Sequence, residues 1–261
     1  MGCKKMIWDQ LTSRQLGSLD SAIPVILPVS ATEQHGPHLP LATDRMIGEH
    51  FCRKIDAEIK DKVLILPSVS VGCSWHHMDF AGTLSVKHDT FIRQVEDILS
   101  TVAHHGFVNM IIFNSHGGNI AVGQLLMEKL GTKFSKGHIV MVTWWKLISE
   151  VLFDLDESGP GGVGHAGEFE TSLMMHIAPE LVHHELIEEV KNIKSFDWAE
   201  TDMLRGSKAS LYRSMKEMTS NGAFGDPSAA SEEKGRKIAE LVTSAMKKII
   251  SDLHKVEKKR D

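Results

Sequence analysis

Short apolar runs alternate with amphipathic stretches along most of the chain. Four runs, bounded by Pro, Gly or Ser, predict buried strands at residues 23–30, 63–71, 108–115 and 138–145. The stretches between them predict helices over about residues 42–59, 87–105 and 119–134, with Gly106 placed to end the second. A long helix is expected over about residues 228–257.

Repeated β-α-β order predicts an α/β fold in which helices cover both faces of a mostly parallel (mixed) sheet. At 261 residues the chain is long enough to bury one full core. It shows no internal repeat and no low-complexity linker, so we expect a single domain over residues 1–261. Only residues 180–225 loosen into a polar segment, interpreted as a lid or an assembly arm.

Composition narrows the class of partner. A net charge of -5 and a pI near 6.3 supply no basic field for nucleic acid or an anionic membrane. No apolar stretch reaches the roughly 18 residues of a membrane span. The three cysteines, Cys3, Cys52 and Cys73, are odd in number and lack a C-x-x-C spacing, which fits a reducing cytoplasm. We therefore expect a cytoplasmic protein with a small-molecule substrate.

Polar side chains cluster where two of the expected strands end. Glu33 and His35 follow the first strand, and Asp44 comes nine residues after His35. His116 follows the third strand in "NSHGGN", where Gly117 leaves room for the backbone near a ligand. Because ligands of open parallel sheets bind beyond the carboxyl ends of the strands, these clusters are expected to converge there.

Carboxylate and imidazole donors without thiolate suit Zn²⁺, Mn²⁺ or Fe²⁺. The four side chains are enough for one ion, whereas two ions that share Asp44 require a further ligand. Glu168 and Glu170 in "GHAGEFETS" offer one. Two divalent ions would be neutralised by Glu33, Asp44, one of these glutamates and a bridging hydroxide. One ion or two, and Glu168 or Glu170, remain open alternatives.

The segment from Gly162 to Gly167 matches the dinucleotide pattern G-x-G-x-x-G. It follows the acidic "FDLDESGPG" rather than a strand, so nucleotide binding is not expected. The glycines are better interpreted as allowing His165 and Glu168 to approach a metal and its substrate.

Four segments resemble the signature blocks of the creatininase (creatinine amidohydrolase) family, in the family's order and across roughly residues 20–240. They are "EQHGPHLPLATD", "NSHGGN", "GHAGEFETS" and "NGAFGDPSAASEEKG". The resemblance implies a three-layer α/β/α sandwich, two divalent metal ions per chain and assembly as a homo-oligomer, usually a hexamer.

By motif, the resemblance also implies roles for single residues. Glu33, Asp44 and His116 would bind one metal, and His35 and Asp44 the other. His165 would lie beside the substrate and pass a proton to the leaving nitrogen, with His77 as the reserve. The segment "GCSWHHMDFAGT" would help to line the pocket through Ser74 and His77.

The chain departs from creatininase proper at two places. Gly117 and Gly118 stand where the family carries an aromatic residue and a glutamate ligand, so Glu168 becomes the expected substitute ligand. Gly161 and Gly162 stand where a Trp-Asp pair contacts creatinine. The resemblance therefore does not extend to creatinine as the substrate.

The expected function is hydrolysis of a C–N amide bond, in a cyclic amide or a formamide, by an enzyme with two divalent ions. Such ions lower the pKa of a shared water and polarise the substrate oxygen. An alternative is another metal-assisted reaction, such as opening a cyclic ketone or processing a peptide. A non-enzymatic metal-binding protein is a third interpretation, against which the presence of all four ligands argues.

Overall fold

The computed structural model describes residues 6–134, 136–188 and 192–257; Cys3 lies outside this range. At its centre is a four-stranded sheet in the order β2-β1-β3-β4. Every pairing between these strands is parallel. The strands are β1 (Val25–Val29), β2 (Leu64–Ile65), β3 (Asn109–Asn114) and β4 (His138–Thr143). The four predicted strands are confirmed, and each is shorter than its apolar run.

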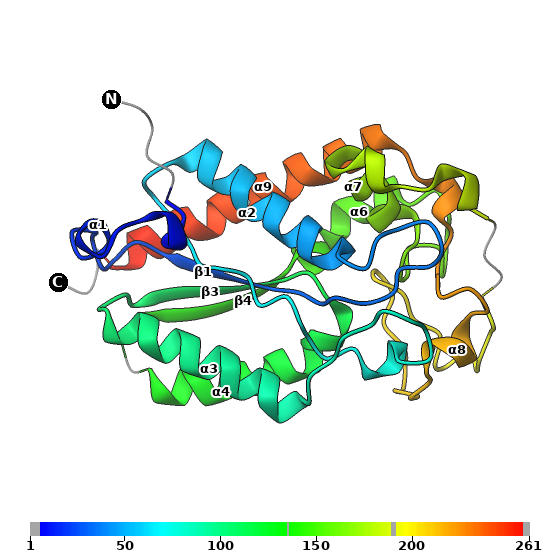
Figure 1. Ribbon diagram of the computed structural model, residues 1–261, viewed down its shortest axis with the longest axis horizontal. Coiled ribbons are helices and arrows are strands. Elements are labelled where there is room, and N and C mark those ends of the chain that lie inside the picture. Colours follow the sequence, from blue (N-terminus) through cyan, green and yellow to red (C-terminus); the bar gives the residue numbers. More distant parts are fainter. Residues whose placement is uncertain (1–5, 135, 189–191, 258–261) are drawn as a thin grey trace.

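Helices cover both faces of the sheet, so the predicted three-layer α/β/α arrangement is confirmed (Figure 1). One face carries α2 (Thr43–Ile59), α7 (Glu168–Ile177) and α9 (Glu232–Glu257). The opposite face carries α3 (His88–His104) and α4 (Ile120–Lys133). The shorter helices are α1 (Ser13–Leu16), α5 (Trp144–Leu147), α6 (Ser149–Leu155) and α8 (Met215–Met218).

Strand β1 explains why its sequence is a continuous apolar run. All five of its residues are buried. Ile26 points into the core with Phe51 of α2, whereas Leu27 points into the opposite core with Val95 of α3. Both faces of the strand are thus removed from water, which requires apolar residues at odd and even positions alike.

The described residues between α7 and α9, which leave out 189–191, have little regular structure, as their polar pattern predicted. They contain three 3₁₀ turns, Pro179–Leu181, His184–Leu186 and Pro227–Ala229, and the four-residue helix α8. The segment returns to the core where Met203 N–H donates to Val163 O at 3.3 Å. Among the described helices, none is both long and apolar enough to cross a bilayer.

Strands β1 and β3 are parallel neighbours, so their carboxyl ends lie at the same end of the sheet. Just beyond it, Ser115 N–H donates to Val29 O at 3.1 Å. The Ser115 hydroxyl donates to the main-chain oxygen of Asp44 at 2.8 Å, which ties the start of α2 to the end of β3. The loops after both strands therefore bring their polar residues together, as the strand-end pattern predicted.

Candidate metal and catalytic site

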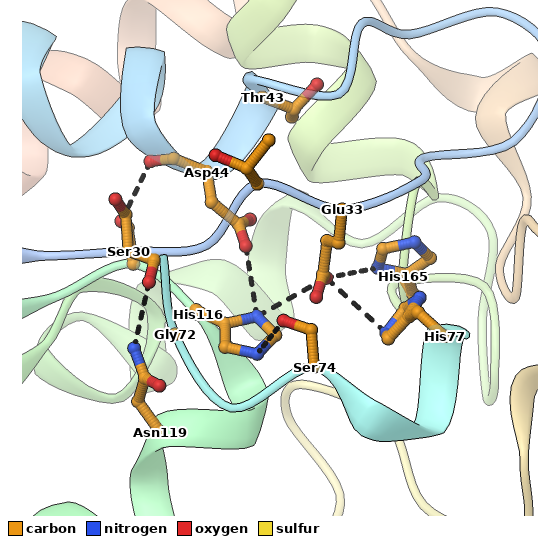
Figure 2. Close-up of polar contacts among 12 residues, drawn as sticks. Ser30, Glu33, Thr43, Asp44, Gly72, Ser74, His77, His116, Asn119 and His165 are labelled. Carbon is orange, nitrogen blue, oxygen red and sulfur yellow. Dashed lines mark hydrogen bonds and ion pairs between the residues drawn. The ribbon is translucent and has the colours of Figure 1, made fainter. Parts of the chain in front are cut away.

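Glu33, His35, Asp44 and His116 meet in one buried cluster. Oε1 of Glu33 lies 3.3 Å from Nδ1 of His116, and Oδ2 of Asp44 lies 3.0 Å from the same nitrogen (Figure 2). Nε2 of His35 lies 3.2 Å from Oδ1 of Asp44. All four side chains are at most 3% exposed. The four strand-end residues selected from the sequence thus converge on one point.

The second ring nitrogen of each cluster histidine faces the main chain. Nε2 of His116 lies 3.2 Å from Cys73 O, and Nδ1 of His35 lies 3.1 Å from Glu33 O. A carbonyl only accepts, so each of these nitrogens carries a proton and donates it. The lone pairs of Nδ1 in His116 and Nε2 in His35 therefore face the carboxylates, which is how proteins orient histidines toward a metal.

Two carboxylate oxygens of the cluster are buried without a hydrogen-bond partner in the described part of the chain. They are Oε2 of Glu33 and Oδ2 of Asp44. Although Oδ2 lies close to His116 Nδ1, the pair is not aligned as a hydrogen bond. Buried carboxylates are costly unless they are paired or bind a metal. Convergent lone pairs with orphaned oxygens fit a divalent ion in the cluster.

Glu170, not Glu168, lies beside this cluster. Oε2 of Glu170 lies 3.8 Å from Nε2 of His35, and His35, His165 and Glu170 are grouped closely enough to hold an ion. Glu168 points elsewhere: its carboxylate accepts from Ser158 N at 3.0 Å and pairs with buried Lys234 of α9. The expected ligand role of Glu168 does not match this position, because the lysine holds its carboxylate away from the cluster.

His77 and His165 lie beside Glu33 and are joined by Gln34, a residue that the sequence analysis missed. Oε1 of Glu33 is 3.4 Å from Nε2 of His77 and 3.6 Å from Nδ1 of His165. The Gln34 side-chain amide donates to Nδ1 of His77 at 2.8 Å and to Gly222 O at 3.0 Å. Nε2 of His165 donates to Gln34 O at 2.7 Å. Gln34 thus fixes which nitrogen of each ring faces the cluster.

The glycine-rich segment that carries His165 packs tightly against residues 224–225. His165 forms an antiparallel bridge with Phe224, and a Cβ built at Gly164 would lie 1.9 Å from Phe224 O. A Cβ at Gly167 would meet Gly225 at 3.1 Å. The glycines allow this close approach, which positions His165. The segment 221–235, which includes Phe224, therefore packs against the segment that carries His165 and holds it in place.

A cavity of about 550 Å³ opens onto the cluster and has Gly117, His77 and His165 in its wall. The apolar residues of its lining include Trp145, Met203 and Phe224. Ser74 is not part of this wall: it is buried, and its hydroxyl lies 3.3 Å from Nε2 of His116. Ser74 therefore contacts His116, a candidate metal ligand, and does not occupy the substrate-lining position that we expected.

Burial is the largest influence on the pKa of each of these groups, and neighbouring carboxylates outweigh it only at His35 and His116. Burial lowers the pKa of His35, but the charge of Asp44 overcomes this and raises it to about 9. The carboxylate of Glu33 likewise raises the pKa of His116 against burial. Burial lowers the pKa of His165 to about 3 and raises that of Glu170 to about 7. His165 is therefore neutral near pH 7, while His35 and His116 hold protons when no metal displaces them.

The family model for creatininase (creatinine amidohydrolase) matches residues 8–250. The chain belongs to the creatininase family. A mycofactocin precursor peptide peptidase of Mycobacterium ulcerans is 30% identical over 253 residues, 91% of this chain and 88% of that protein. The creatinine amidohydrolase of Pseudomonas putida is 28% identical over 172 residues, 60% of this chain and 65% of that one. These named relatives are hydrolases.

Solved creatininases share the fold. A manganese form has a TM-score of 0.79 at 24% identity and covers 95% of this chain and 98% of its own. A creatininase variant of the Zn-Zn type has a TM-score of 0.78 at 24% identity, with the same coverage. The fold expected from the signature blocks is thereby confirmed, and metal-containing structures occur among the neighbours of this creatininase-family chain.

Proposed function

We propose that this protein is a hydrolase that uses two divalent metal ions to cleave a C–N amide bond. The observation that carries the proposal is the cluster of lone pairs and orphaned carboxylate oxygens on Glu33, Asp44 and His116, beside a cavity. Three carboxylates, those of Glu33, Asp44 and Glu170, supply the negative charge that two divalent ions need, together with one hydroxide.

The fit of the residues suggests how the ions would be shared. Glu33, Asp44 and His116 would hold one ion, while His35, Asp44 and Glu170 would hold the other. Asp44 has one oxygen toward each histidine, Oδ1 toward His35 and Oδ2 toward His116, which suits a bridging carboxylate. Bound divalent ions supply an activated water near neutral pH and polarise the substrate carbonyl.

His165 and His77 would manage the proton. His165 is neutral near pH 7, and its Nε2–H is engaged by Gln34 O, so its Nδ1 lone pair is free to accept a proton. The same nitrogen can then donate to the leaving amine, which departs poorly as an anion. His77 presents Nε2–H beside Glu33 and would orient the carboxylate or the substrate.

Two substrate classes fit this chemistry. A cyclic amide or formamide is the class expected from the signature blocks. A peptide is favoured by the cavity volume of about 550 Å³, which lies in the range for ligands well above the size of a single small ring. The relatives named as peptide peptidases also match 91% of the chain, against 60% for the creatinine amidohydrolase.

A substrate panel tests the proposal directly. The metal-loaded protein is incubated with cyclic amides, N-formyl amines and short peptides, and released amine is quantified, with His165→Asn and a chelated sample as controls. We expect release from at least one class, and a loss of about 10²–10⁴-fold in His165→Asn with metal retained. No release from any class by fully loaded protein would contradict an amidohydrolase.

A further inference from the structure

The outer edges of β2 and β4, the two edges of the sheet, differ in what covers them. At the outer edge of β2, Ile65 N–H donates to Met6 O at 2.9 Å, and Ile7 forms a parallel bridge with Ile65. The N-terminal segment thus covers that edge. Strand β4 pairs with β3 alone within the described residues, so no strand covers its outer edge. Uncovered edges are templates for pairing with another extended chain.

The main chain of β4 shows which groups face this open edge. His138 N–H donates to Val108 O, on the side of β3. Because successive residues of a strand point their amide groups to opposite sides, those of Ile139, Met141 and Thr143 face outward. The sequence of β4, "HIVMVT", contains no proline, lysine or arginine, the residues that commonly protect an edge.

An apolar groove of about 470 Å³ runs beside this edge. Met127 of α4 and Ile249 of α9 form its two sides, and the segment 140–143 forms its floor. The side chain of Met141 lies over Gly123, where an added Cβ would be 2.2 Å from its Cε. The groove thus combines outward amide groups with apolar surface on both sides, the two features that bind extended peptides.

The groove adjoins the catalytic cavity. Ile120 and Lys146 line both hollows, so they form a shared ridge between them. Lys146 is the one residue with a full charge among those that line the groove. An extended chain with a scissile amide in the cavity would cross this ridge and lie along β4, whereas a single small ring would not reach it.

We propose that the groove beside β4 binds the extended flanking segment of a peptide substrate, which adds as a strand to the main chain of Met141 and Thr143. The occupant rests on the peptide class of the proposed function. Main-chain hydrogen bonds would hold the segment, and alternate side chains of the peptide would pack on Met127 and Ile249. This adds recognition of the substrate's length and extended shape to the chemistry of the metal cluster.

The test measures binding of a fluorescein-labelled hexapeptide of alternating valine and serine by fluorescence anisotropy. Met141→Pro removes an outward N–H without loss of a bond to β3, and Ile249→Arg places a charge in the groove. Leu125→Arg, at a 52% exposed position of α4 outside the groove lining, is the matched control. We expect affinity to fall about tenfold in both groove variants and to stay unchanged in the control.

Hydrolysis of N-formyl amines and cyclic amides, measured in the same four proteins, separates this proposal from the proposed function. Weakened peptide binding with an unchanged small-amide rate supports the groove. Equal peptide affinity in all four proteins, or no binding by the unsubstituted protein, would overturn it even if amides are cleaved. Dissociation of an oligomer by Ile249→Arg in analytical ultracentrifugation, with peptide affinity unchanged, would assign the groove to a second copy and also overturn it. Peptide binding that depends on the groove without cleavage of any amide would reject the proposed function alone.

Discussion

Nδ1 of His116 lies 3.0 Å from Oδ2 of Asp44, yet the two atoms are not aligned as a hydrogen bond. The other ring nitrogen of His116 donates to Cys73 O, so Nδ1 turns its lone pair toward a carboxylate. Such an arrangement costs free energy unless a cation lies there. A proton on His116 supplies it in the metal-free protein, and a divalent ion would take its place in the proposed enzyme.

Because a proton takes the place of the metal ion beside His35 and His116, the metal-free protein is predicted to lose stability as the pH rises from about 7 to 9. His35 has a folded pKa of about 9 against an ordinary value of 6.5, and the pKa of His116 is also raised. Their contribution to stability is complete below pH 6.5 and is lost as the pH rises through the folded values. Urea unfolding in a chelator at about pH 7, 8 and 9 measures it.

The pH range of this prediction follows from the opposite pKa shifts of the site histidines. Burial lowers the pKa of folded His165 to about 3, so near pH 6.5 this histidine changes its charge only in the unfolded chain. Above about pH 7.5 it is neutral in both states and adds no pH dependence to the stability. We expect the midpoint of unfolding to fall with pH in the chelator and to rise with pH when Mn²⁺ or Zn²⁺ is present. An unchanged or rising midpoint in the chelator would contradict protonated His35 and His116.

The two glutamates at the start of α7 are predicted to differ in their effect on stability. Glu168 is fully buried and pairs with Lys234, which is 7% exposed. Glu168→Gln removes the buried anionic partner of that ammonium and leaves it the exposed carboxylate of Glu157 and the carbonyl of Ala229, which should lower the free energy of unfolding by about 3 kcal/mol. Glu170→Gln should change it by about 1 kcal/mol or less in metal-free protein, because the amide still accepts from Ala166 N.

Urea denaturation of both variants with the metal removed checks this contrast. Lys234→Met is the matched companion, since it removes the ammonium in the Glu168→Gln background and should recover part of the loss. Equal stability of Glu168→Gln and Glu170→Gln would show that the Lys234 pair is not a structural one.

Gln34 is predicted to position His77 and His165, the two proposed catalytic histidines, without binding metal. Its amide reaches His77 and Gly222 O, and its main-chain oxygen receives Nε2–H of His165. Gln34→Leu removes the side-chain bonds only, so we expect kcat to fall about 10–100-fold with metal content unchanged.

Gly222→Ala is expected to disturb the Gln34 amide as well and so to lower kcat. A Cβ at Gly222, which has φ of 95°, would lie 2.0 Å from Oε1 of Gln34 and would displace the amide. We expect the same loss of kcat as in Gln34→Leu, with no additive loss in the double variant. A fall in metal content in Gln34→Leu would instead place this residue among those that hold the ions.

Much of this architecture is readable in the sequence because local pattern decides it. Residues 25–29 form a buried run between turns, and the 3.6-residue period of 88–104 fixes a helix. The least accurate bounds are those of the strand predicted over 63–71, of which only Leu64–Ile65 is a strand. Glu33, His35, Asp44 and His116 were found because parallel strands bring their carboxyl ends together.

The choice between Glu168 and Glu170 is not decided by the local sequence pattern. Both residues lie in the first turn of α7, where positions two apart face different sides of the helix. Which side faces the cluster depends on Lys234, a buried cation that lies 66 residues away in α9. Gln34 was missed for a related reason, since its partner His165 is separated from it by 131 residues.

Elemental analysis of the purified protein tests the central claim most directly. We expect about two divalent ions per chain in the unsubstituted protein and in folded Glu168→Gln. Glu170→Gln is expected to retain fewer ions, and His116→Ala fewer still, with folding checked by circular dichroism. Loss of metal in Glu168→Gln with retention in Glu170→Gln, or no metal in reconstituted protein, would contradict the account.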